Sequence, residues 1–87
     1  MTKTIFKYPL SNASDITELG LTGPVLHFAE QHGRLVLWAE HDPEVKPVLR
    51  KFQIVGTGNP IPDNALFLGS TLTSGGLFVF HLYEVMS

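Results

Sequence analysis

The sequence predicts an all-β, mainly antiparallel domain, built as a small sandwich or partly open barrel of six or seven strands with little or no helix. Short apolar runs rich in β-branched and aromatic side chains are separated by Gly, Pro, Asn and Asp at close intervals. Two of these runs are apolar on both faces, as expected for strands that are covered on both sides. A chain of 87 residues has room for one core, so we expect a single domain over residues 1–87.

The N-terminal part predicts one clear strand and one weak strand. Apolar and polar residues alternate over Lys3–Leu10, where Pro9 has no N–H donor and suits an edge strand or a strand end. After a polar connector, a weak strand is expected over Ile16–Leu21. The alternative for that segment is a short helical turn capped by Ser14.

A β-hairpin is expected in the middle of the chain. Val25–Glu30 and Leu35–Glu40 flank a compact connection, Gln31–Arg34, in which Gly33 can adopt a positive φ. The following segment, His41–Pro47, is expected to be a loop because its two prolines fit neither a paired strand nor a helix interior.

The C-terminal half predicts a further strand and a second hairpin. Val48–Val55 has the character of a strand, and Gly56–Asn64 is too rich in turn-forming residues to be regular. The last hairpin is expected to pair Ala65–Leu72 with Leu77–Val85 through Thr73–Gly76.

The composition indicates that the domain has little polar surface. Hydrophobic residues make up 44% of the chain and charged residues only 16%, which is below the average of about 25%. The two-faced runs, Leu35–Trp38 and Leu77–Val85, need cover from a second sheet, a closed barrel or a partner subunit. We therefore expect a homo-oligomer, since a small domain of this kind exposes an apolar patch or covers it with another copy.

Charge and targeting signals argue against nucleic acids and membranes as partners. Six Lys and Arg against eight Asp and Glu give a net charge of -2, which supplies no basic surface for duplex DNA or anionic lipid. The N-terminus lacks the apolar region of a signal peptide, and no apolar run approaches the roughly 20 residues that span a bilayer. The chain has no cysteine, which favours a reducing cytoplasm.

The Gly56–Pro60 loop is the most distinctive local feature. Its two glycines around a hydroxyl residue can present consecutive backbone N–H groups to an anion, and Arg50 and Lys51 could complete a phosphate site with this loop at a subunit boundary. Prolines rather than a helix follow the loop, so no phosphate-binding motif is met, and the competing interpretation is a bulge or turn. Trp38 would be an interface anchor if it were exposed near Arg50. The residues predicted to bind are Trp38, Arg50, Lys51, Gly56, Thr57, Gly58 and Asn59.

No catalytic or metal site is expected. The four histidines form no H-x-H or H-x-x-x-H pattern, and no cysteine is present to complete a zinc site. Ser70, His81 and Asp63 supply the residue types of a catalytic triad, but no nucleophile-elbow sequence surrounds the serine. We therefore expect no catalytic residues, no metal and no cofactor.

The histidines are expected to have structural roles. His32 and His41 lie at predicted turns, where exposure to solvent is the default. His27 and His81 lie within predicted strands, so each is expected to be half-buried with a backbone or carboxylate partner.

The order of five segments resembles a known protein family. These segments are Lys3–Leu10, Leu37–Pro43, Phe52–Pro62, Phe67–Thr71 and Gly75–Glu84. Together they resemble small uncharacterised proteins of tailed bacteriophages and prophages. The resemblance covers nearly the whole chain, and Ser11–Pro24 departs from it most.

The resemblance implies a phage origin, the bacterial host cytoplasm and a compact β fold, without a reaction or site residues to carry over. Phage proteins of this size often inhibit host machinery. We therefore expect a non-enzymatic binding protein that inhibits a host protein complex, with an anti-defence, anti-CRISPR-like role. The alternatives are a sponge for a cyclic-nucleotide or other small phosphorylated signal, and a virion assembly accessory. This step is an association between families and functions.

Overall fold

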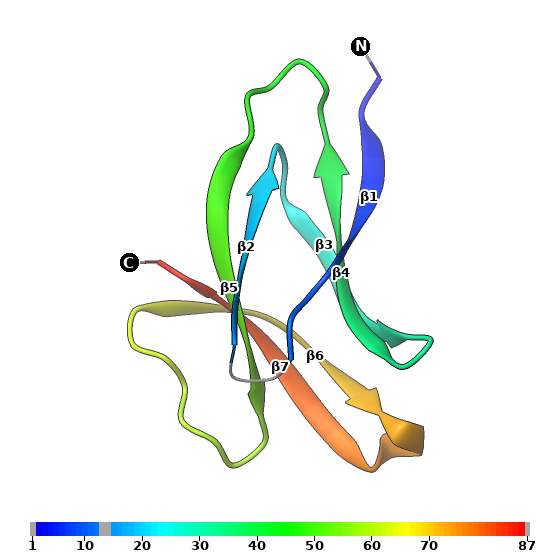
Figure 1. Cartoon of the computed structure of the whole chain (residues 1–87), viewed down its shortest axis with the longest axis vertical. Coiled ribbons are helices and arrows are strands. Elements are labelled where there is room, and N and C mark those ends of the chain that lie inside the picture. Colours follow the sequence, from blue (N-terminus) through cyan, green and yellow to red (C-terminus); the bar gives the residue numbers. More distant parts are fainter. Residues whose placement is uncertain (1, 13–14, 87) are drawn as a thin grey trace.

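The computed structural model describes residues 2–12 and 15–86, without the side chain of Ser74, and shows an all-β chain of seven strands (Figure 1). In chain order these are β1 (Thr4–Pro9), β2 (Ile16–Leu21), β3 (Val25–Gln31), β4 (Arg34–His41), β5 (Val48–Gly56), β6 (Ala65–Thr73) and β7 (Phe78–Val85). A 3-10 turn, η1 (Ser74–Gly76), precedes β7. The predicted fold class is confirmed, and each predicted strand is present to within about two residues at its ends.

The strands form two antiparallel sheets. Sheet A has the order β1-β4-β3, and sheet B has the order β2-β5-β7-β6. The predicted hairpins are β3–β4 and β6–β7. The sheets do not close into a barrel, although the edge strands β3 and β6 approach each other closely: a Cβ built on Gly69 would lie 3.9 Å from the Cβ of Phe28.

The turn between β3 and β4 is shorter than the sequence indicated. His32 (φ 53) and Gly33 (φ 79) alone connect the two strands. Two successive positive φ values are the geometry that matches the right-handed twist of paired strands. Glycine adopts this conformation readily, while a histidine there is uncommon.

The alternative helical turn after the first connector is wrong, because Ile16–Leu21 pairs along its whole length with β5. The register joins Ile16 to Gln53 and Leu21 to Val48. Ladder hydrogen bonds along six residues outweigh the weak local preference for a helical turn. Ser14, the proposed cap, lies outside the described residues.

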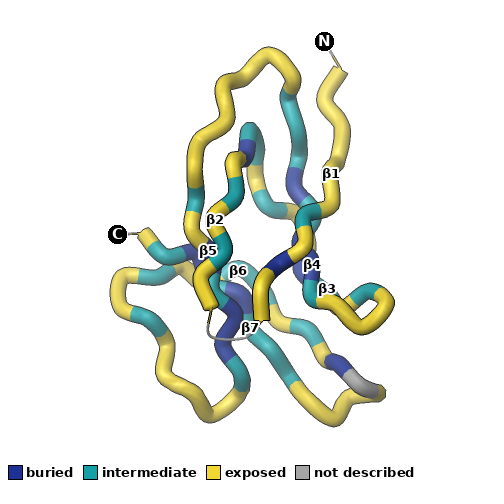
Figure 2. Tube along the Cα trace, viewed as in Figure 1, coloured by how far each residue is buried: buried dark blue, intermediate teal, exposed yellow. Residues whose placement is uncertain are grey.

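One hydrophobic core lies between the sheets and draws on both of them (Figure 2). Its buried residues are Leu10, Leu21, Phe28, Leu37, Ala39, Phe52, Ile54 and Leu82. Phe52 and Ile54 alternate with residues that face away from sheet A, so sheet B has a core face and an outer face. The outer face of sheet B carries the candidate site described below.

The chain passes from sheet B to sheet A at Gly23, where it lies very close to β4. A Cβ built on Gly23 would lie 2.8 Å from the carbonyl oxygen of Glu40 and 2.9 Å from its Cβ. The backbone N–H of Glu40 also donates to the carbonyl of Pro24, at 3.1 Å. Only glycine allows this approach without a backbone shift.

We expect Gly23→Ala to lower the free energy of unfolding by about 1–3 kcal/mol, because the added methyl group must displace the backbone of β4. Chemical denaturation followed by circular dichroism measures the change. Gly69→Ala is the matched control, since its added Cβ would make only an ordinary contact of 3.9 Å with Phe28. Equal stability of Gly23→Ala and the wild type would contradict the close packing at the crossover.

Candidate functional site

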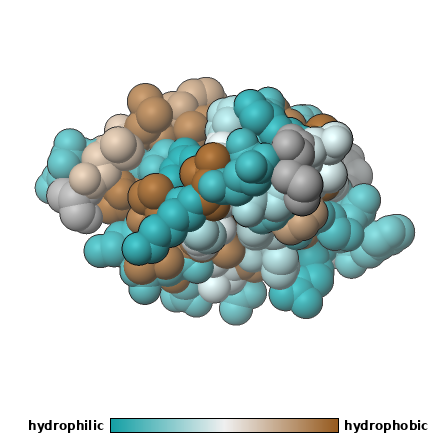
Figure 3. Space-filling view, turned by 90° about the horizontal axis from the view of Figure 1, so that it is seen from above, coloured by the Kyte–Doolittle hydropathy of each residue, from teal (hydrophilic) through white to brown (hydrophobic). Residues whose placement is uncertain are grey.

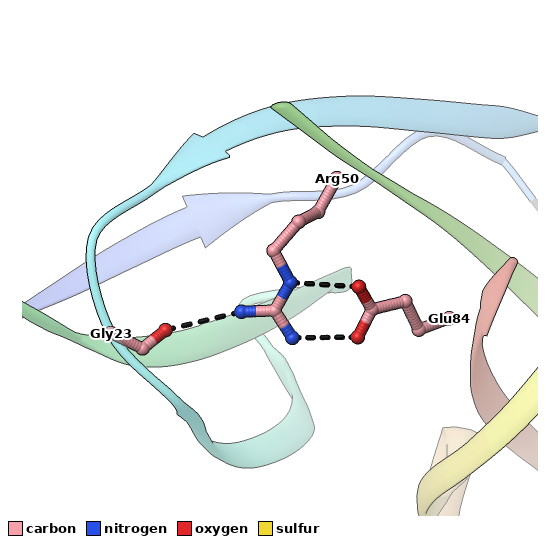
Figure 4. A network of polar contacts seen from close by, with 3 residues as sticks. All are labelled: Gly23, Arg50 and Glu84. Carbon is pink, nitrogen blue, oxygen red and sulfur yellow. Dashed lines mark hydrogen bonds and ion pairs between the residues drawn. The ribbon is translucent and has the colours of Figure 1, made fainter. Parts of the chain in front are cut away.

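Arg50, one of the residues predicted to bind a ligand, forms hydrogen bonds with other residues of the same chain (Figure 4). Its Nε donates to Glu84 Oε2 at 2.8 Å and its Nη2 donates to Glu84 Oε1 at 2.6 Å. Its Nη1 donates to the carbonyl of Gly23 at 3.2 Å. The guanidinium therefore joins β5, β7 and the crossover between the sheets, and it has little capacity left for an external anion.

The two charges of this ion pair stabilise each other. Hydrogen bonds from Arg50 hold the pKa of the Glu84 carboxyl below its usual value, although burial acts in the opposite direction. The same hydrogen bonds raise the pKa of Arg50. A fork-to-fork pair of this kind is among the stronger ion pairs in proteins.

The predicted phosphate site, made of Arg50, Lys51 and the Gly56–Pro60 loop, is not assembled within a single chain. Arg50 and Gly56 are six residues apart on one strand, which separates them by about 20 Å. Arg50 and Lys51 border a surface hollow with Glu84. The Gly56–Asn59 turn lines other hollows, so one chain by itself does not bring Arg50 and this turn around one ligand, and a site shared between two subunits stays a prediction.

The Gly56–Asn59 turn is a tight turn and not an anion nest. The N–H of Asn59 donates to the carbonyl of Gly56 at 3.0 Å, and the N–H of Thr57 donates to the carbonyl of Val79 at 3.2 Å. Gly58 has a φ of 93, which accounts for a glycine at this position. These N–H groups are used within the fold, in agreement with the competing interpretation of a turn that ends β5.

His81 lies beside this turn, on the outer face of sheet B, with a hydroxyl group at each ring nitrogen. Ser70 Oγ is 2.6 Å from Nδ1, and Thr57 Oγ1 is 2.9 Å from Nε2. The imidazole thus links β6, β7 and the turn after β5. His81 is half-buried as predicted, but its partners are hydroxyls and not a backbone group or a carboxylate.

Ser70 and His81 are in contact as two members of a catalytic triad would be, but the third residue at the imidazole is not an acidic one. Thr57 occupies the place of the orienting carboxylate, and no contact between Asp63 and His81 is found among the described residues. A hydroxyl cannot stabilise an imidazolium as a carboxylate does. The two hydroxyl contacts fix the position of the ring.

Apolar side chains surround His81 on the outer face of sheet B. Phe67 packs edge-on against Tyr83, with ring centroids 5.6 Å apart. Ile61 and Tyr83 line a hollow of about 210 Å³ together with His81. We call Ile61, Phe67, Leu72 and Tyr83 the outer patch; the first three of these are exposed. Hydrophobic side chains also reach the surface at the end of the molecule shown in Figure 3.

Trp38 lies in the other sheet and does not join the outer patch. It alternates with the buried Leu37 and Ala39, so it occupies the outer face of sheet A, where it is half-buried. The imidazole of His27 is tilted against the indole at 5.6 Å. His27 is exposed, contrary to the expectation of a half-buried side chain.

His41 was expected to be exposed, and it is instead half-buried at the end of β4. Its ring stacks on Phe6 with centroids 4.1 Å apart, and its Nδ1 is 3.3 Å from Thr22 Oγ1. His32 is exposed, as predicted. In the described part of the chain, no group of three or more His, Asp or Glu side chains is placed to hold a metal ion.

Comparison with known proteins places the whole chain in one family. A family model described as a domain of unknown function, DUF7352, matches residues 1–87. The chain belongs to this family. No curated protein and no solved structure matches it. In the structure, residues 2–12 and 15–86 contain no helix with the length and hydrophobicity needed to cross a bilayer.

We expect Glu84→Gln to lower the free energy of unfolding by about 1–3 kcal/mol at neutral pH, because Arg50 loses its charged partner. The folded pKa of Glu84 is depressed, so its stabilising contribution is present above the unfolded value of about 4.3 and is lost as the pH falls through the folded value. The difference between wild type and variant should therefore shrink in acid.

Denaturation curves at a series of pH values measure this effect. Glu18→Gln is the control, since Glu18 is an exposed carboxylate of β2. A difference between wild type and Glu84→Gln that stayed constant down to strongly acidic pH would argue against the ion pair as its origin.

Proposed function

We propose that this chain is a non-enzymatic binding protein that recognises a protein partner through the outer patch. The observation that carries the proposal is the exposure of Phe67 and Leu72 on the outer face of sheet B, together with that of Ile61 in the adjoining β5–β6 connection. Apolar and aromatic groups on a rigid surface are typical of the central part of a protein interface. Scattered exposed apolar residues are normal, whereas a group of them on one face points to a partner.

The rigidity of the face supports the proposal. His81 ties β6 to β7 and to the Gly56–Asn59 turn through two hydroxyl contacts. The N–H of Met86 donates to the carbonyl of Asn64 at 2.8 Å and holds the other end of the loop. A preorganised surface loses less conformational entropy on binding, which favours affinity.

The resemblance to phage proteins suggests which partner to test. We propose a bacterial host protein complex, in particular a defence system of the host cytoplasm, which the chain would inhibit by occupying a surface. The low proportion of charged residues, 16%, further supports self-association as part of the active form.

The alternative function is a sponge for a small phosphorylated signal. The hollow beside His81 and Gly58 favours it, since it is concave and partly polar. Two observations argue against it. The N–H groups of Thr57 and Asn59 already donate within the fold, and the guanidinium of Arg50 is paired with Glu84. A virion assembly accessory is a further alternative, for which the chain should be found in purified particles.

We expect Phe67→Ser to weaken capture of the protein partner by about tenfold or more, because a buried aromatic anchor contributes about 2 kcal/mol at an interface. Affinity purification of the tagged chain from bacterial cells, with quantitative mass spectrometry, measures the retained partner. Phe78→Ser is the matched control: Phe78 is 54% exposed and Phe67 53%, but Phe78 lies outside the outer patch.

Equal retention by the two variants would contradict the outer patch as the binding surface. A wild-type chain that retains no protein partner, in cells that carry an active defence system, would contradict the binding function itself. Circular dichroism of both variants confirms that each one is folded.

A further inference from the structure

Phe80, a residue of β7, lines two hollows of the surface. Figure 1 shows the β3–β4 turn and the start of β7, which border them. The first has a volume of about 320 Å³ and lies between the turn of β3–β4 and the segment after β1, where Arg34 and Leu10 line it. The second has a volume of about 520 Å³ and lies between the Gly56–Asn59 turn and the start of β7. Both volumes fall within the range of small-molecule sites.

The Phe80 ring is fixed on one side and open on the other. It packs against the hydrophobic core, and the register of β5 and β7 places Gly56 directly opposite it. A Cβ on Gly56 would lie 3.0 Å from Asn59 Nδ2 and 3.6 Å from Phe80 Cε1, so the glycine makes room for the Asn59 amide beside the ring. The part of Phe80 that is available to a ligand is therefore the part that lines the two hollows.

Phe78 extends this surface. Its ring centroid is 6.3 Å from that of Phe80, with the planes inclined by 33°. Phe78 is exposed and lines the second hollow beside Leu77. Two neighbouring rings of this kind offer a planar aromatic molecule both stacking and edge contacts.

Arg34 supplies a positive charge at the same place. It lines the first hollow together with Phe80, and it is exposed. Within residues 2–12 and 15–86, no hydrogen bond or ion pair of its side chain is found, in contrast to Arg50. None of the described residues that line the two hollows is acidic.

We propose that these hollows form a binding site for a small planar aromatic molecule that carries one anionic group. The ring of the ligand lies against Phe80 and Phe78, and its carboxylate or phosphate pairs with Arg34. A guanidinium binds either anion through a charge-assisted hydrogen bond. The site is separate from the outer patch, so this inference does not depend on the proposed function.

Titration of the isotope-labelled full chain, followed by amide NMR, tests the site. The probes are adenosine 5′-monophosphate for the phosphate and 1-naphthoate for the carboxylate, with uncharged adenosine for comparison. We expect saturable shifts at the amides of Gly33–Leu35 and Phe78–Phe80 with at least one anionic probe, and the stronger probe identifies the anion. Adenosine should bind about tenfold more weakly than its monophosphate if the phosphate is used.

Two variants with matched controls locate the site. Arg34→Gln and Phe78→Ser should each weaken the bound probe by about tenfold. Lys51→Gln removes an exposed cation elsewhere, and Phe67→Ser removes an equally exposed ring from the outer patch, so both should leave the affinity unchanged. Phe67→Ser thereby separates the two proposals, because it should lose the protein partner and keep the small ligand.

Three results would overturn the inference. The first is the absence of saturable shifts with both anionic probes. The second is an unchanged affinity in Arg34→Gln, which would show that the cation is not used. The third is equal weakening by Phe78→Ser and Phe67→Ser, which would show that the ring beside Phe80 has no particular role.

Discussion

The ion pair between Arg50 and Glu84 is the interaction on which the two-sheet arrangement depends. Its guanidinium binds a carboxylate of β7 and the carbonyl of Gly23, where the chain leaves sheet B for sheet A. Gly23 in turn lies against Glu40 of β4. A charge at the border of the core is costly unless it is paired, so Arg50 has to keep both partners. Its hydrogen bond to Gly23 therefore holds the crossover in place.

The strands could be predicted from the sequence because their signals are local. Alternation, β-branched residues and turn formers lie within a few positions of one another, and β3–β4 needed no more than the glycine of its turn. The segment Ile16–Leu21 has only weak local signals, so a helical turn remained an alternative there. Its strand is stabilised by pairing with β5, about thirty positions further along the chain. Which strands share a sheet is a property of the whole fold, so the order β2-β5-β7-β6 was not predictable.

The candidate site was harder to predict because its contacts join distant segments. Arg50 was predicted to bind a ligand because its partner Glu84 is 34 positions away and gives no local signal. The contact of Ser70 with His81 depends on a bulge between Phe67 and Gly69. Without the bulge, Gly69 would lie opposite His81 and Ser70 would face the core. No pattern in the sequence specified that irregularity, although the glycine at its end was a weak signal.

The gap between β3 and β6 has a further consequence. The two edge strands approach closely at Gly69, yet no ladder of backbone hydrogen bonds joins the sheets there. Contact across this line depends on side-chain packing, so a small sliding movement of one layer over the other breaks no backbone pairing. Shear of this kind is a common way for packed elements to adapt to different occupants. The two layers are thus tied by backbone and side-chain hydrogen bonds at the Gly23 crossover, and by side-chain packing alone along the line between β3 and β6.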